Sequence, residues 1–159
     1  MKKLTIVALL AFSMVAFASA QSEGMIELES GFDPDPFEVE VVADAYDPIE
    51  LEVEWGTAEV YYQDAEPHLE LVYEAGPFEL YLEFFPDDPD ADTVLVVVTP
   101  DDQFLTNDDN DGLNPGIVVE APVSGSYLIG IGSWEEGTVP GIFSVSEIGF
   151  QNVDAEGGM

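Results

Sequence analysis

The sequence has no cysteine, a single histidine and only two basic side chains among its 159 residues. Without cysteine, the chain has no disulfide, no thiolate nucleophile and no thiolate ligand for zinc. Both basic residues, Lys2 and Lys3, stand at the extreme N-terminus. The rest of the chain therefore has no side chain that could neutralise phosphate or form a Schiff base. These absences exclude nucleic acid as a partner and argue against most classes of enzyme.

The first twenty residues have the pattern of an export signal. Lys2 and Lys3 precede an apolar stretch from Leu4 to Phe17, and residues 18–20 (Ala-Ser-Ala) form a small-residue cleavage site. The apolar stretch is shorter than the about 20 residues that a bilayer-spanning helix needs, and no later stretch is apolar enough. We therefore expect cleavage near Ala20, a secreted or periplasmic protein, and no membrane insertion after cleavage.

Cleavage would leave an extremely acidic chain. All 34 Asp and Glu residues follow residue 20, so losing the two lysines takes the formal charge from −32 to −34. High charge often indicates disorder, but 47% of the residues are hydrophobic, which is enough for one core. The charge disfavours anionic membranes and leaves cations and basic proteins as partners.

Apolar and acidic residues alternate with a period of two in several segments. In Ile49–Trp55 and Phe78–Phe84, apolar side chains would share one face and most carboxylates the other, as in a half-buried strand. Thr93–Val98 is a continuous apolar run, which indicates a strand buried on both faces. Shorter runs, separated by Pro and Gly, predict the other strands: Phe37–Val41, Glu59–Tyr62, Leu69–Tyr73, Ile117–Val119, Tyr127–Ile131 and Ile142–Val145. The pattern predicts an all-β fold of nine or ten short strands, a sandwich or jelly roll.

The chain is of a size for one domain. We expect a signal peptide at 1–20, a flexible N-terminal segment at 21–30, a β-sandwich domain at 31–150 and a flexible tail at 151–159.

The densest polar chemistry lies between residues 101 and 115. Asn107-x-Asp109-x-Asp111-Gly112 fits the first half of a calcium loop, but the twelfth position is Val118 instead of Glu, so it is not an EF-hand. A sandwich loop could still bind Ca²⁺ with further oxygens from Asp101 or Asp102. The alternative is a solvated turn, because Asn, Asp and Gly are ordinary turn residues.

Four other features have structural explanations as well as functional ones. His68 stands at a predicted strand start, and the chain has no nucleophile-elbow motif, so we predict that it is not catalytic. The acidic residues at 87–92 predict a solvated loop stiffened by Pro89. Trp134 could be an exposed anchor for a sugar or protein, or it could fold over one end of the sandwich. With 34 acids, paired carboxylates occur by chance and do not by themselves indicate a glycosidase.

The C-terminal half resembles the bacterial pre-peptidase C-terminal domain, and more closely its small stand-alone secreted relatives. The resemblance covers residues 30 to about 147 and is carried by an ordered set of motifs: Ser30-Gly31-Phe32-x-Pro34-Asp35-Pro36, Asp92-Thr93-Val94-Leu95, Thr99-Pro100-Asp101, Asn107-Asp108-Asp109, Gly112-Leu113-Asn114-Pro115, Gly125-x-Tyr127 and Ile131-Gly132-Ser133. It implies a jelly-roll sandwich without catalytic residues, with a role in binding, folding or targeting. Some related domains bind calcium.

The resemblance also extends the candidate calcium site to Asn114, because residues 107–114 match the strongest motif of the family. The complete candidate set is Asp101, Asp102, Asn107, Asp109, Asp111 and Asn114. The chain departs from the family in having Thr106 where a Cys is expected, and in lacking basic residues.

These observations predict a non-catalytic secreted β-sandwich that binds a protein or glycan outside the cytoplasm, with Ca²⁺ as a candidate stabilising ion. Two alternatives remain open. One is a secreted hydrolase that uses carboxylates, and the other is an acidic envelope protein whose charge only keeps it soluble.

Overall fold

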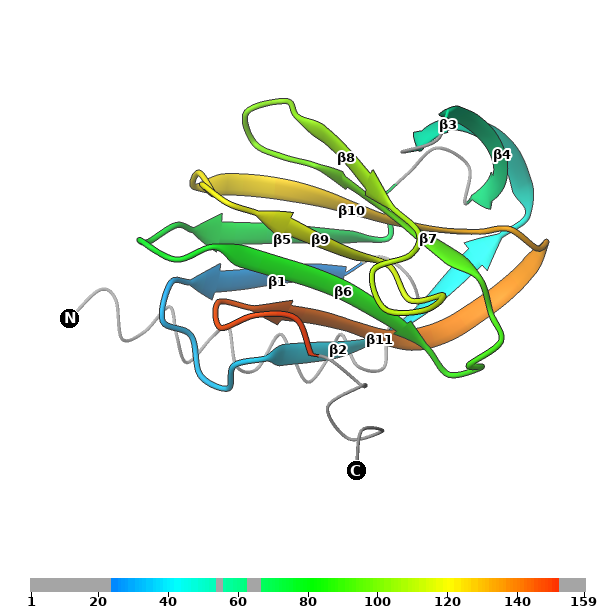
Figure 1. Cartoon of the computed structure of the whole chain (residues 1–159). Helices are drawn as coiled ribbons and strands as arrows, with labels where there is room; N and C mark the ends of the chain where they lie inside the picture. The colour runs from blue at the N-terminus through cyan, green and yellow to red at the C-terminus, as the bar shows by residue number, and fades with distance from the viewer. Residues whose placement is uncertain (1–23, 54–55, 63–66, 152–159) are drawn as a thin grey trace.

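The computed structural model describes residues 24–53, 56–62 and 67–151 (Figure 1). Over these ranges the chain forms eleven strands and no helix: β1 (Gly24–Glu29), β2 (Phe37–Ala45), β3 (Asp47–Val53), β4 (Gly56–Tyr62), β5 (Leu69–Glu74), β6 (Leu80–Pro86), β7 (Thr93–Val98), β8 (Phe104–Asn107), β9 (Gly116–Val119), β10 (Gly125–Ser133) and β11 (Gly137–Ser146). The strands make two sheets, so the predicted all-β sandwich is confirmed. The predicted signal peptide, the end of the predicted 49–55 strand and residues 152–159 of the predicted tail lie outside the described residues.

The strand order is that of a jelly roll. The larger sheet runs β1-β5-β10-β4-β3, with β7 also paired to β10 and β8 to β7, and the smaller sheet runs β2-β11-β6-β9. Apart from β1 and the β3–β4 hairpin, the strands pair from the outside of the chain inward. β2 pairs with β11, β5 with β10, β6 with β9 and β7 with β8, all antiparallel. This nested pairing folds one long hairpin of strands into two sheets, which is the jelly-roll arrangement.

The core lies between the sheets and follows the period-two pattern of the sequence. On β10, Tyr127, Ile129 and Ile131 point inward and are fully buried, and they pack with Phe84 and Phe143 of the smaller sheet. Burying a side chain of this size stabilises the fold by about 1.5–3 kcal/mol. The two sheets are therefore held mainly by apolar contacts.

The run Thr93–Val98 is buried on both faces, as predicted. Leu95 and Val97 join the main core, whereas Val94 and Val96 belong to a second cluster beneath the β3–β4 hairpin. This hairpin thus covers part of the outer face of the larger sheet.

Strand β1 corrects, for residues 24–29, the expectation of a flexible segment at 21–30. Gly24–Glu29 pairs in parallel with β5, with Gly24 opposite Leu69. Ile26 and Leu28 are buried in the main core, while Met25 and Glu27 are exposed. The segment does alternate, but it has only two core residues, and its pairing partner stands more than forty positions away in the sequence.

The last described residues cover part of the outer face of the smaller sheet. The ring of Phe150 packs edge-on against Tyr81, with centroids 5.0 Å apart, and the backbone N–H of Gln151 donates to Glu83 Oε2 at 2.8 Å. Glu83, which the alternation placed in solvent, is only 2% exposed. Burial raises the pKa of Glu83, the Gln151 hydrogen bond opposes this, and the charge of Asp111 adds to it.

Candidate functional site

The six predicted calcium ligands lie in two groups at opposite ends of β8. Asp101 and Asp102 belong to the turn between β7 and β8, whereas Asn107 ends β8 and the other three follow it. Four residues of strand extend over about 10 Å, which separates the two groups. Among the described residues, no group of three or more His, Asp or Glu side chains is arranged to hold a metal ion. Calcium binding therefore stays a prediction from sequence.

The first group is held by hydrogen bonds within its own turn. Thr99 Oγ1 donates to Asp101 Oδ1 at 2.6 Å, and Gln103 Nε2 donates to Asp101 Oδ2 at 2.8 Å. Both bonds favour the charged form, the Thr99 bond more strongly, and they lower the pKa of Asp101. Asp102 has a φ of 62°, the left-handed conformation that Asp tolerates better than most residues in a turn.

The second group also has structural roles. Asn107 Oδ1 accepts the Gly116 N–H at 2.9 Å and fixes the start of β9 against the end of β8. The backbones of Asp111 and Asn114 pair with each other in a tight turn, where Gly112 has a φ of 61°. These contacts explain the Asx-rich sequence as turn structure.

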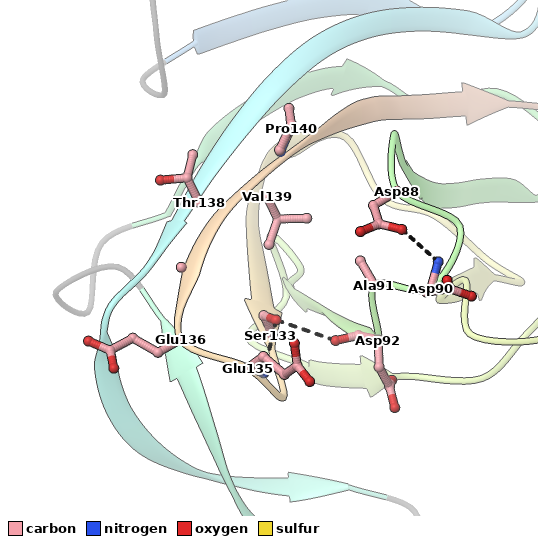
Figure 2. Close-up of a pocket in the computed structure, with 11 residues that line it drawn as sticks. Asp88, Asp90, Ala91, Asp92, Ser133, Glu135, Glu136, Thr138, Val139 and Pro140 are labelled. Atoms are coloured by element: carbon pink, nitrogen blue, oxygen red, sulfur yellow. Dashed lines mark hydrogen bonds between the residues drawn. The ribbon is translucent and has the colours of Figure 1, made fainter.

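A cleft of about 300 Å³ lies between the β6–β7 loop and the β10–β11 hairpin (Figure 2). Five carboxylates line it and none of its lining residues is basic. The loop contributes Asp88, Asp90 and Asp92, and the hairpin contributes Glu135 and Glu136. Figure 2 shows Glu136 pointing away from the loop. The cleft is thus a concave surface with charge of one sign only.

The loop of the cleft is bound to the hairpin by backbone contacts. The N–H of Trp134 donates to the Asp92 carbonyl at 3.1 Å, and the N–H of Asp87 donates to the Pro140 carbonyl at 2.9 Å. Asp88 Oδ1 accepts the N–H of Asp90 at 3.0 Å, which closes the turn (Figure 2). The predicted solvated loop is correct for Asp87, Asp88 and Asp90, which are exposed, but not for Asp92. That side chain is half-buried, and its Oδ1 is buried without a hydrogen-bond partner.

The electrostatic field of the β8–β9 loop reaches the cleft. Burial is the main cause that raises the pKa of Asp92, and the charges of Asp109, Asp108 and Glu135 raise it further. Burial and the charge of Asp108 also raise the pKa of Asp109. Two acidic segments that the sequence shows as separate loops, 87–92 and 107–111, therefore act on one site. The sequence pattern did not predict that these two segments act on one site, or that the charge of Glu135 acts on Asp92. Both depend on the strand order.

We expect Asp92→Asn to raise the midpoint of thermal unfolding at pH 7 by about 2–4 °C, because it removes one charge from a crowded, half-buried group. The raised pKa of Asp92 means that its contribution to stability is present at low pH and lost as pH rises through the folded pKa. The gain should therefore shrink in melts at pH 4.

Glu38→Gln, an exposed carboxylate on β2, removes the same charge outside the cleft and serves as the control. A lower midpoint for Asp92→Asn at pH 7, or an equal gain for both variants, would contradict the crowding of charge in the cleft.

His68 is fully buried and immediately precedes β5. Its Nδ1 accepts the Ile131 N–H at 3.0 Å, and its ring packs edge-on against Tyr62 at a centroid distance of 5.3 Å. Burial lowers its pKa to about 4, although the charge of Asp44 acts in the opposite direction. A ring without solvent contact cannot meet a substrate, so the structure supports a core role for this histidine.

Trp134 is half-buried and packs against the second core cluster. The structure therefore supports the alternative in which this side chain folds over one end of the sandwich.

Comparison with known proteins adds little to this geometry. No family model matches the chain, and no curated protein matches it. Among solved structures it is similar to Aeromonas hydrophila PliG, a periplasmic lysozyme inhibitor of g-type lysozyme. The two share 16% identity with a TM-score of 0.42, over 78% of this chain and 97% of that one. A likeness at this level carries no argument about function, and the resemblance to pre-peptidase C-terminal domains stays a prediction.

Proposed function

We propose that this chain is a non-catalytic module that acts outside the cytoplasm and binds a cationic partner. The observation that carries the proposal is the cleft, which is lined by five carboxylates and by no basic side chain. Bringing a positive group into the cleft would relieve the repulsion that helps to raise the pKa of Asp92. The surrounding negative charge would also steer such a partner toward the surface. The extracytoplasmic location rests on the signal-peptide pattern of residues 1–20.

Several features favour binding over catalysis. The single histidine is buried, and after residue 3 the sequence offers no Lys, Arg or Cys as a nucleophile or as a clamp for substrate. The cleft contributes only Ser133 and Thr138 as hydroxyl groups. A raised carboxyl pKa alone does not make an acid catalyst, because a substrate must also be positioned.

A binding titration tests the proposal. Oligolysine is titrated by calorimetry into residues 21–159 of the parent chain and of an Asp92→Asn/Glu135→Gln variant at low ionic strength. We expect the affinity to fall about tenfold in the cleft variant, because two close charge contacts are lost. Glu38→Gln/Glu40→Gln, which removes two exposed charges of β2, is the matched control and should bind nearly as the parent does.

Equal losses in both variants would mean that oligolysine responds to diffuse charge and not to the cleft. Hydrolysis of a glycan or peptide substrate, abolished in the cleft variant, would instead favour the carboxylate hydrolase. The same titration with CaCl₂ and MgCl₂ tests the calcium prediction for residues 107–114.

A further inference from the structure

A row of five residues, three of them exposed and apolar, crosses the outer face of the larger sheet. The registers place Met25 of β1 opposite Glu70, Glu70 opposite Leu128, Leu128 opposite Val98, and Val98 opposite Phe104 of β8. Met25 is 44% exposed, Leu128 38% and Phe104 52%. Because neighbouring strands lie about 4.8 Å apart, the row extends over about 19 Å. We refer to these five residues as the outer row.

The outer row lies on the half of this face that the described chain leaves uncovered. On the other half, the β3–β4 hairpin packs on Val94 and Val96, and the Tyr62 side chain lies directly over Gly130. On β10, Leu128 alternates with the buried Tyr127 and Ile129, so its side chain points away from the core. Leu128, Val98 and Phe104 are adjacent along the row, and adjacent apolar side chains mark interaction surfaces more often than isolated ones do.

Carboxylates border the outer row at both ends. At the β1 end, Glu27 follows Met25 on the same face, and Glu70 lies within the row, where its Oε1 accepts the Ser126 hydroxyl at 2.7 Å. At the β8 end, Asp101 and Asp102 form the turn that precedes Phe104. Neighbouring side chains on a sheet face are closer than the screening length of about 8 Å, so these charges act on whatever covers the row.

The charge of the border decides between the possible occupants. A second copy of this chain would place the same carboxylates against each other, and the sequence has no Lys or Arg after residue 3 to pair with them. A partner that carries Lys or Arg around an apolar anchor would neutralise the border and cover the row. We propose that the outer row is a docking surface for a basic protein that inserts an aliphatic or aromatic anchor. This inference rests on the proposed function and names a second contact surface for the same partner.

Two probes separate the apolar contact from the charge. The first is a short peptide of alternating lysine and leucine, and the second is an oligolysine of equal net charge. Leu128→Ser and Phe104→Ser in residues 21–159 should each weaken binding of the lysine–leucine peptide by about tenfold, and they should leave oligolysine binding unchanged. Ile148→Ser, which changes an exposed apolar residue elsewhere, should not weaken either probe. Thermal melts of each variant confirm folding.

The outcomes are distinct. If the serine variants bind both peptides as the parent does, or if the parent binds the lysine–leucine peptide no tighter than oligolysine, the docking surface is wrong while the proposed function stands. If neither probe binds the parent at low ionic strength, the proposed function fails and the docking surface fails with it. If the parent dimerises in sedimentation and Leu128→Ser abolishes the dimer, the row belongs to a second copy of the chain and the proposed docking of a basic protein is wrong.

Discussion

Replacing Ile26 and Leu28 of β1 by alanine should lower the free energy of unfolding by about 4 kcal/mol or more. Each side chain is buried in the main core, and truncating a buried Ile or Leu typically removes about 2–5 kcal/mol. Since small domains are stable by about 5–15 kcal/mol, the double variant would lose much of its folded population. Urea titration of residues 21–159, followed by tryptophan fluorescence, measures the change.

Met25→Ser is the matched control, because Met25 is exposed on the same strand. It should change the free energy of unfolding by no more than about 0.5 kcal/mol. An unchanged stability in the double variant would show that residues 24–29 do not pack on the core in solution and would restore the flexible segment expected from sequence.

Replacing His68 by asparagine should remove a large part of the destabilisation at acid pH. The pKa of His68 is lowered from 6.5 to about 4 in the folded state. Between these two pH values the unfolded chain is protonated at His68 and the folded chain is not. The stability that neutral His68 contributes is therefore complete above about pH 6.5 and is lost as pH falls toward 4. A difference of this size corresponds to about 3 kcal/mol. The asparagine side chain would keep an acceptor for the Ile131 N–H but would not titrate.

The measurement compares urea unfolding of both proteins at pH 7, 5.5 and 4. The free energies of unfolding should converge as pH falls, because the parent chain loses about 3 kcal/mol more than the variant does. The raised pKa values of Asp92, Asp109 and Glu83 act in the opposite direction, but these three groups are common to both proteins. Parallel profiles would mean that His68 can bind a proton while the chain stays folded.

The sandwich was predictable from the sequence because burial of one strand face imposes a period of two. The alternation failed where a later part of the chain covers the outer face. Glu83 follows the pattern of an exposed carboxylate, yet the segment ending at Gln151 buries it. Phe78 continues the apolar series of β6 but lies before the strand and is exposed. Neither outcome can be read from the local pattern, because each depends on a contact or a strand limit set by the tertiary fold.

The candidate site was less predictable than the fold. The calcium-loop pattern at 107–111 can be recognised in the sequence, but in the structure the surrounding residues form turns. The Asp101 side chain accepts hydrogen bonds within its own hairpin. The cleft joins Asp92 with Glu135, which are more than forty residues apart, and their proximity follows from the pairing of β7 with β10. The sequence alone predicts that the site is acidic. It does not predict where the site lies, because the location depends on the strand order.

The nested pairing of the jelly roll implies that the acidic side chains also have a role during folding. Strand β2 pairs with β11, with Phe37 opposite Val145, so the smaller sheet cannot close until nearly the whole chain is available. Folds with such distant pairings form slowly, and an unpaired strand is then open to pairing with another chain. On β2, Glu38 and Glu40 are exposed between Phe37, Val39 and Val41. Charges placed in this way act as gatekeepers against aggregation, so the acidic side chains of β2 protect the chain before the smaller sheet has closed.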